Sequence, residues 1–165
     1  MSHEAAGKSN EWYTPKYIFD ALGCEFDLDV AHPFGIKTNV PTKRWIHSDS
    51  LDCPWNGFVW MNPPFGNMKS KYQWINKFID HGNGIALMPD RTSAPWWQHF
   101  ANSSDCVLFV SGKIKFIDQN GKRGESPSNG TTLFGIGARA DQALRNAADK
   151  GLGKFYSNYD KTKVI

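Results

Sequence analysis

Short apolar runs recur along the chain and predict buried β-strands, because a strand covered on both faces is nearly continuously hydrophobic. Alternation of Phe26, Leu28 and Val30 with acidic residues predicts a half-buried strand instead. The predicted strands cover residues 26–30, 57–61, 84–88, 106–117 and 131–136, with a bend at Ser111-Gly112 that divides 106–117 into two, and a minor strand near Trp45-Ile46.

Apolar residues at helical spacing predict helices between these strands. The predicted helices cover residues 15–22, 71–81, 96–101 and 139–150. Thr14 is the expected N-cap of the first helix, Pro15 its first residue, and Gly23 its end. Residues 119–129 are expected to form a polar loop, and residues 151–165 a C-terminal tail.

Strands alternate with helices until the C-terminal third, where one strand follows another. This order predicts an α/β protein whose sheet is mostly parallel, with an antiparallel hairpin at one edge. A length of 165 residues fits one domain of ordinary size. We therefore expect a flexible N-terminal tail over residues 1–10 and a single domain over residues 11–165.

The composition is that of a globular protein, with 40% hydrophobic and 21% charged residues. No apolar run approaches the roughly 20 residues of a membrane helix, and residues 1–10 lack the apolar segment of a signal peptide. Cys24, Cys53 and Cys106 are odd in number and far apart, which favours reduced thiols in the cytoplasm. The five His are scattered, so we expect no metal site.

The net charge of +3 is unevenly distributed. Residues 1–90 carry 8 Lys and Arg against 10 Asp and Glu, whereas residues 91–165 carry 11 against 6. A basic C-terminal half suits a polyanionic partner such as a nucleic acid, although a basic face can also be merely solvated.

The sequence Asn62-Pro63-Pro64-Phe65 directly follows the predicted strand at 57–61. Ligands of open α/β sheets bind at the carboxyl ends of the strands. The two prolines fix the backbone and donate no hydrogen bonds, which leaves carbonyl groups free to accept. Asn62 adds an amide, and Phe65 adds a ring that can stack on a planar group. Together they suit an amino group on a flat heterocycle, and a plain strand-ending turn is the less favoured interpretation.

This motif resembles the catalytic motif of amino-methyltransferases, in which Asp, Asn or Ser precedes Pro-Pro and an aromatic residue. More narrowly, the chain resembles the small phage and prophage family of DNA N6-adenine methyltransferases. The resemblance spans residues 12 to about 136. It is carried by 59–66 and, in family order, by Trp12-Tyr13-Thr14-Pro15, Phe26-Asp27-Leu28-Asp29-Val30-Ala31, Met88-Pro89-Asp90-Arg91-Thr92, Trp96-Trp97 and Gly112-Lys113-Ile114-Lys115-Phe116.

The resemblance implies a Rossmann-like methyltransferase fold and methyl transfer from S-adenosylmethionine to an adenine flipped out of double-stranded DNA. The catalytic residues that it implies are Asn62, Pro63, Pro64 and Phe65. The Asn62 side-chain oxygen and the Pro63 carbonyl accept hydrogen bonds from the N6 amino group, and Phe65 stacks on the base. The resemblance further implies a role in restriction-modification and a cytoplasmic location, which is the cytoplasm of the bacterial host if the protein is phage-encoded.

The resemblance also implies where S-adenosylmethionine binds. The cofactor residues are Trp12, Tyr13, Thr14, Pro15, Asp27, Asp29, Ala31, Asp49 and Asn62. Asp29 and Asp27 compete for the α-amino group of the cofactor. Asp49 is expected beside its adenine, or else is an ordinary loop residue. The Gly-x-Gly turn of the wider superfamily is absent, and His32-Pro33-Phe34-Gly35 occupies that stretch.

Five basic residues are candidates for contacts with DNA phosphates. They are Arg91, Lys113, Lys115, Lys122 and Arg123. The loop 119–129 is expected to contribute to target recognition, because no separate recognition domain is evident. Trp96 and Trp97 are expected in the core rather than on bases. Methylation of RNA adenine or of a protein glutamine, and a DNA-binding remnant without catalysis, are the alternatives.

Overall fold

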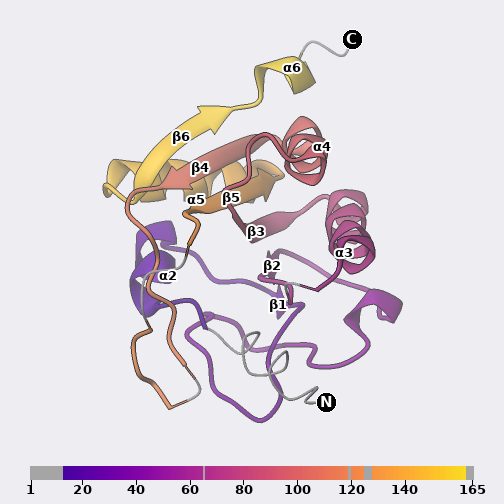
Figure 1. The fold of residues 1–165 in the computed structure, drawn as a ribbon, viewed down its shortest axis with the longest axis vertical. Coiled ribbons are helices and arrows are strands. Elements are labelled where there is room, and N and C mark those ends of the chain that lie inside the picture. The colour runs from indigo at the N-terminus through magenta and orange to yellow at the C-terminus, as the bar shows by residue number, and fades with distance from the viewer. Residues whose placement is uncertain (1–12, 65, 119, 125–127, 163–165) are drawn as a thin grey trace.

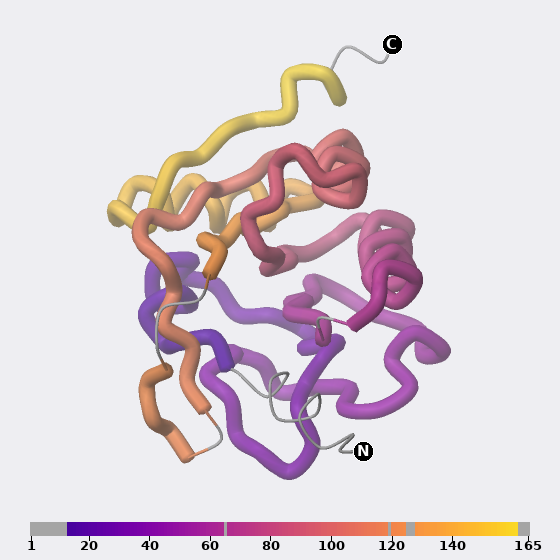
Figure 2. The backbone as a smooth tube through the Cα atoms, viewed as in Figure 1, coloured from indigo at the N-terminus to yellow at the C-terminus, as the bar shows by residue number. Residues whose placement is uncertain are grey.

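The computed structural model describes residues 13–64, 66–118, 120–124 and 128–162, and Figures 1 and 2 trace them. The strands are β1 (Leu28–Asp29), β2 (Val59–Met61), β3 (Gly84–Pro89), β4 (Cys106–Val110), β5 (Thr131–Ile136) and β6 (Gly153–Ser157). The helices are α2 (Lys16–Leu22), the short 3-10 helix η1 (Ser50–Asp52), α3 (Met68–His81), α4 (Pro95–Ser103), α5 (Ala138–Asp149) and α6 (Tyr159–Thr162). The predicted tail at 1–10 lies outside the described residues.

One mixed sheet forms the centre of the molecule, with the strand order β1-β2-β3-β5-β4-β6. The pairs β1–β2 and β2–β3 are parallel, whereas β3–β5, β4–β5 and β4–β6 are antiparallel. The α/β class is therefore confirmed. The predicted strand arrangement is confirmed in part: the β1–β2 and β2–β3 pairs are parallel and the C-terminal strands pair antiparallel, but antiparallel pairs outnumber parallel ones, so the sheet as a whole is not mostly parallel.

Side chains alternate between two cores, one on each face of the sheet. Phe58 and Trp60 pack with α2 and α5, while Val59 and Met61 pack with α3 and α4. This is the period-2 geometry of a strand, in which neighbouring residues point to opposite faces. Trp96 belongs to the second core, as does Trp97, so both are core residues as expected. The helices therefore cover both faces of the sheet, as Figure 1 shows.

The first helix begins one residue later than expected. Pro15, not Thr14, is the N-cap of α2, and no side chain caps the helix. Gly23 ends it in the left-handed conformation, with φ +64°, as predicted. Helix α3 begins earlier than predicted because the Asn67 side chain accepts a hydrogen bond from the Ser70 N–H at 2.9 Å.

Two predictions for the C-terminal third were wrong. Residues 111–117 do not form a second strand, because Ile114 and Phe116 anchor this segment to the core and only Ile117 makes isolated bridges. The segment 151–165 is not merely a tail, because β6 pairs antiparallel with β4. The β6 side chains are mostly exposed, so the strand lacks the apolar run by which buried strands are recognised.

The carboxyl ends of β1, β2 and β3 lie at the same edge of the sheet, which we call the carboxyl edge. β4 ends there too, since β5 runs antiparallel to both β3 and β4. The predicted minor strand is present as a parallel bridge between Trp45 and Asp29, and it lies along the free side of β1.

Candidate active site

The loop that follows β2 begins at the carboxyl edge. Asn62 is half-buried, Pro63 is buried and Pro64 is exposed. The Pro64 carbonyl accepts a hydrogen bond from the Gly66 N–H at 2.9 Å, which closes a tight turn. Among the described residues, none donates a hydrogen bond to the Pro63 carbonyl. Phe65, the aromatic residue of the motif, lies outside the described residues.

Asn62 contacts the segment that precedes α2. Its side-chain nitrogen, Nδ2, donates to the Thr14 hydroxyl oxygen at 3.4 Å. Thr14 is 4% exposed, and its carbonyl accepts from the Asn39 side chain at 3.2 Å. Because Nδ2 faces Thr14, the amide oxygen Oδ1 is the atom of Asn62 that remains for a ligand. Thr14 is therefore part of the site, although not as the helix cap.

The structure separates the two competing acids. Asp29 is 2% exposed at the end of β1, and its carboxylate accepts from the Ala31 N–H at 3.2 Å. Asp27 precedes β1 and is exposed; it accepts from the Phe58 N–H at 2.7 Å, at the amino end of β2. Asp29 therefore lies at the same edge as Asn62, and Asp27 lies toward the opposite edge.

His32, which the sequence analysis did not single out, contacts Asp29 in the candidate site. Its Nδ1 lies 2.9 Å from an Asp29 carboxylate oxygen, and its Nε2 lies 3.0 Å from the Ile36 carbonyl. Both ring nitrogens thus face acceptors, which only the doubly protonated ring can satisfy. The hydrogen bond to Asp29 raises the pKa of His32. The signal in the sequence was the three-residue spacing of Asp29 and His32.

Trp45 forms the outer wall beside His32. The two rings stack with centroids 5.1 Å apart, and 53% of Trp45 is exposed. Asp49 lies further along this segment, exposed, in the left-handed conformation at φ +55°. Among the described residues it is the only non-glycine with positive φ, a conformation in which Asp is enriched. No described hydrogen bond connects Asp49 to Asn62.

Tyr13 connects the site to a hairpin. Its backbone N–H donates to the Ile117 carbonyl at 2.8 Å, and the Ile117 N–H donates back at 3.0 Å. Ile117 also bridges Arg123, and the Gly124 N–H donates to the Phe116 carbonyl. Residues 116–124 therefore form a small hairpin beside the Thr14 segment. Pro15 follows directly as the cap of α2, whereas Trp12 lies outside the described residues.

Asp118 stabilises the turn of this hairpin. Its side-chain oxygen accepts from the backbone N–H groups of Asn120 and Lys122, at 2.9 and 2.8 Å. An aspartate that binds the backbone ahead of it is a common way to fix a turn. The predicted polar loop is thus an ordered hairpin over the part that the structure describes, and residues 119 and 125–127 are outside it.

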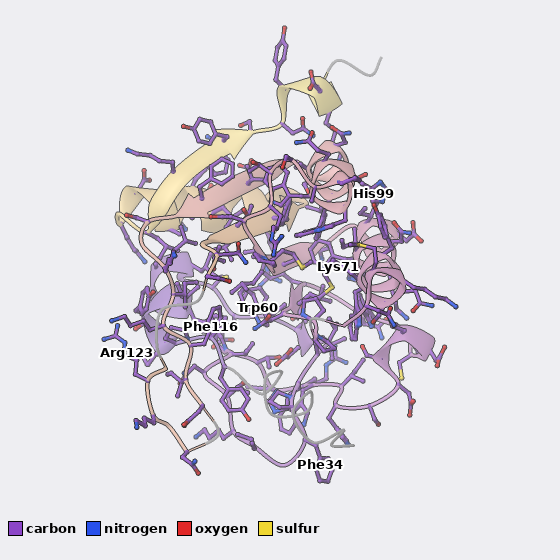
Figure 3. All side chains as sticks on the ribbon, viewed as in Figure 1. Phe34, Trp60, Lys71, His99, Phe116 and Arg123 are labelled. Carbon is purple, nitrogen blue, oxygen red and sulfur yellow. The ribbon has the colours of Figure 1, made fainter. Side chains whose placement is uncertain are left out.

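The predicted DNA-contacting residues fall into two places. Lys113, Lys115, Lys122 and Arg123 are all exposed and lie on or just before the hairpin. Arg91 follows β3 on the other side of the Asn62 loop. In Figure 3, Arg123 lies near the left margin, whereas Lys71, which was not predicted, lies to the right of Trp60 of β2. Basic side chains thus flank the loop from two directions.

A cavity of about 510 Å³ opens between the Trp45 segment and the loop that leads into β2, where Cys53 and Pro54 contribute to its wall. It lies apart from Asn62. Within the described ranges, no three His, Cys, Asp or Glu side chains are grouped so that they could hold a metal ion. None of the described helices has the length and apolar character needed to span a membrane.

Comparison with known proteins identifies the family. A model of the family described as DNA N-6-adenine-methyltransferase (Dam) matches residues 1–139. Neither the curated proteins nor the solved structures contain a match. The family match covers both the Thr14 segment and the Asn62 loop, which the fold brings into contact. The chain therefore belongs to the DNA N-6-adenine-methyltransferase (Dam) family, a family of methyltransferases.

Proposed function

We propose that the protein methylates the exocyclic N6 nitrogen of an adenine that is flipped out of double-stranded DNA, with S-adenosylmethionine as the methyl donor. The observation that carries this proposal is the environment of Asn62. Its amide nitrogen is held by the buried Thr14 hydroxyl, so its amide oxygen is left for the substrate at the carboxyl edge. A second acceptor, the Pro63 carbonyl, lies one residue further along the chain.

These two acceptors suit the chemistry of an aromatic amine. The lone pair of the adenine amino nitrogen is delocalised into the ring, which makes the nitrogen a poor nucleophile. Hydrogen bonds from its two N–H groups to Asn62 Oδ1 and the Pro63 carbonyl favour a localised lone pair directed away from the acceptors. Pro63 and Pro64 hold the loop rigid, so little reorganisation is needed. Phe65 is proposed to stack on the base.

The residues at the carboxyl edge fit the methyl donor. S-adenosylmethionine supplies a methyl group that is already activated on a sulfonium, together with an ammonium group that a carboxylate can bind. The buried Asp29 carboxylate is bonded to the Ala31 N–H and to His32, and its remaining lone pairs can accept from an ammonium. We assign this role to Asp29 rather than Asp27, which lies at the other end of the strand.

Further cofactor contacts are proposed from Trp12, Tyr13, Thr14, Pro15, Ala31 and Asp49. Of these, Tyr13 and Thr14 are buried, Thr14 contacts Asn62, and Ala31 is bonded to Asp29. We also propose that the sheet is a shortened Rossmann-like methyltransferase fold. Its first three strands are parallel, helices cover both faces, and the candidate residues lie at the carboxyl edge, where such folds bind ligands.

We propose that DNA binds across the carboxyl edge. The hairpin, with Lys122 and Arg123, is fixed at its turn by Asp118 and at its base by Tyr13. A rigid basic hairpin can enter a groove without a large loss of conformational entropy on binding. Lys113, Lys115 and Arg91 are proposed to contact phosphates.

A direct test is transfer of radiolabel from S-adenosylmethionine to a panel of unmethylated duplex DNA, RNA and protein. We expect label on duplex DNA and a loss of about 100-fold in rate for Asn62→Ala, as for removal of one hydrogen-bonding group from other active sites. The matched control is Asn56→Ala, at an exposed asparagine before β2, which should keep the wild-type rate. Label on RNA or protein alone, or an Asn62→Ala variant of full activity, would contradict the proposal.

A further inference from the structure

We propose that Lys71 and Arg91 together form a binding site for one backbone phosphate of DNA next to the methylated nucleotide. This inference rests on the proposed function, because it specifies how that substrate is held. Neither the motif nor the hairpin involves Lys71.

The two residues flank the Asn62 loop. Lys71 lies in the first turn of α3, the helix that the loop leads into, nine residues after Asn62. Arg91 follows the end of β3, which pairs in parallel with β2. Both cations are therefore at the carboxyl edge, beside the place where the target base would be bound.

The Lys71 ammonium is held in place by an aromatic ring. Its Nζ lies 4.5 Å from the centre of the Trp96 ring, which belongs to α4. Trp96 is 3% exposed and packed in the core, so the ring is a fixed platform. A cation–π contact of this kind positions an ammonium without neutralising its charge.

Both cations keep their positive charge available. In the part of the chain that the structure describes, neither Lys71 nor Arg91 forms an ion pair. Asp90 is adjacent to Arg91 in the sequence, but its carboxylate accepts from the Thr132 hydroxyl at 2.6 Å and lies against Gly130. An anion that reaches this edge can therefore bind to both cations.

This arrangement is unfavourable in the absence of an anion. Burial lowers the pKa of Lys71, and the nearby Arg91 guanidinium lowers it further. Lys71 also lies at the amino-terminal end of α3, where the helix dipole disfavours cations, and the first turn of α3 contains no acidic residue. A bound phosphate offsets the repulsion between Lys71 and Arg91. It also places a negative charge at the amino-terminal end of α3, where the helix dipole favours one.

The test uses Lys71→Met, which keeps the apolar stem over Trp96, and Lys154→Met as the charge-matched control. Lys154 is exposed on β6, the strand at the far side of the sheet from β1. Binding of fluorescent duplex DNA is measured against salt concentration with S-adenosylhomocysteine present. We expect the slope of log K against log salt to fall in magnitude by about 1 for Lys71→Met and to stay unchanged for Lys154→Met.

The double variant Lys71→Met with Arg91→Gln tests whether the two cations bind the same phosphate or each bind a phosphate of their own. Because only one phosphate is involved, we expect the total loss of slope in the double variant to stay at about 1, and a total of about 2 would show two separate phosphates and overturn the inference. Unchanged slope in Lys71→Met, or equal loss in Lys154→Met, would overturn the inference. So would a loss of S-adenosylhomocysteine affinity in Lys71→Met with the DNA slope intact, because the bound anion would then be the carboxylate of the cofactor. Wild-type protein that methylates no DNA would instead refute the proposed function itself.

Discussion

The Asn62 side-chain nitrogen donates a hydrogen bond to the Thr14 hydroxyl at 3.4 Å, and this contact joins the end of β2 to the segment before α2. A primary amide can face a ligand with either its nitrogen or its oxygen. Only the oxygen can accept from an amino group. The buried Thr14 hydroxyl, itself part of a segment tied to Asn39, accepts from the nitrogen in this structure, and this is the orientation that the proposed reaction needs.

The first prediction concerns this hydroxyl. Thr14→Val keeps the shape of the side chain and removes the acceptor, so the amide of Asn62 loses its fixed orientation. We expect kcat for methyl transfer to fall roughly 3- to 10-fold, the range for one neutral hydrogen bond. Thr14→Ser keeps the hydroxyl and should retain most of the wild-type kcat. Steady-state kinetics with saturating DNA and cofactor measure both.

The Asn62→Asp variant serves as a background that distinguishes orientation from general damage. The two oxygens of a carboxylate are equivalent, so this variant has no wrong orientation to prevent. In that background, adding Thr14→Val should change kcat less than it does in the wild type. The same fold loss in both backgrounds would show that Thr14 acts only on stability or cofactor binding.

A second prediction uses the two acids of the first strand. Asp29→Asn removes the charge proposed to bind the cofactor ammonium, and the dissociation constant for S-adenosylmethionine should rise at least tenfold, as expected for a charged hydrogen bond. Asp27→Asn disturbs a carboxylate that accepts from the Phe58 N–H, so it should lower stability but leave cofactor affinity unchanged. Calorimetric titration measures the dissociation constant of each variant. Weaker binding in Asp27→Asn but not in Asp29→Asn would show that Asp27 binds the cofactor instead.

A third prediction concerns pH. The hydrogen bond to Asp29 raises the pKa of His32 above its ordinary value of 6.5. A raised folded-state pKa adds stability that is fully present below the unfolded-state pKa and is lost as the pH rises through the folded-state pKa. His32→Gln should therefore lower the free energy of unfolding more at pH 5.5 than at pH 8.5, with a difference of about 1 kcal/mol between the two pH values.

Urea unfolding of wild type and His32→Gln at the two pH values measures this difference. Comparison of the two proteins cancels the titration of all other groups. A difference that is the same at both pH values would mean that folding does not shift the pKa of His32.

A fourth prediction concerns the hairpin. Asp118→Ala removes the acceptor for the N–H groups of Asn120 and Lys122, which should unfold the turn. We expect faster cleavage by trypsin after Lys122 and Arg123, both exposed, and a higher KM for DNA with unchanged cofactor affinity. Wild-type resistance to trypsin in the variant would show that the turn does not depend on Asp118.

Much of the fold could be predicted from the sequence, because its buried strands leave continuous apolar runs. The strands that contain Trp60 and Leu87, and the helix closed by Gly82, were all predicted at nearly their true positions. Strand β6 was not, since an exposed edge strand carries little apolar pattern. The antiparallel pairing of β4 with β5 was predicted, but the position of β5 between β3 and β4 was not, because strand order is a property of the assembled sheet.

The candidate site divides in the same way. Local spacing pointed to Asn62 but gave Thr14 only as a helix cap, and only the family resemblance named Thr14 as a cofactor residue. Its contact with Asn62 could not be predicted because it joins residues 48 positions apart. His32 and Lys71 lay outside every motif, and only the folded chain brings them to Asp29 and Trp96. Alternation alone also could not rank Asp27 against Asp29, which differ in the end of the sheet that they occupy.

The most direct test of the central claim is the identity of the methylated nucleoside. Unmethylated duplex DNA is incubated with the protein and S-adenosylmethionine, digested to nucleosides and analysed by mass spectrometry. We predict N6-methyladenine as the product, reduced about 100-fold by Asn62→Ala. A methylated cytosine in its place, or N6-methyladenine formed equally well by Asn62→Ala, would contradict the account.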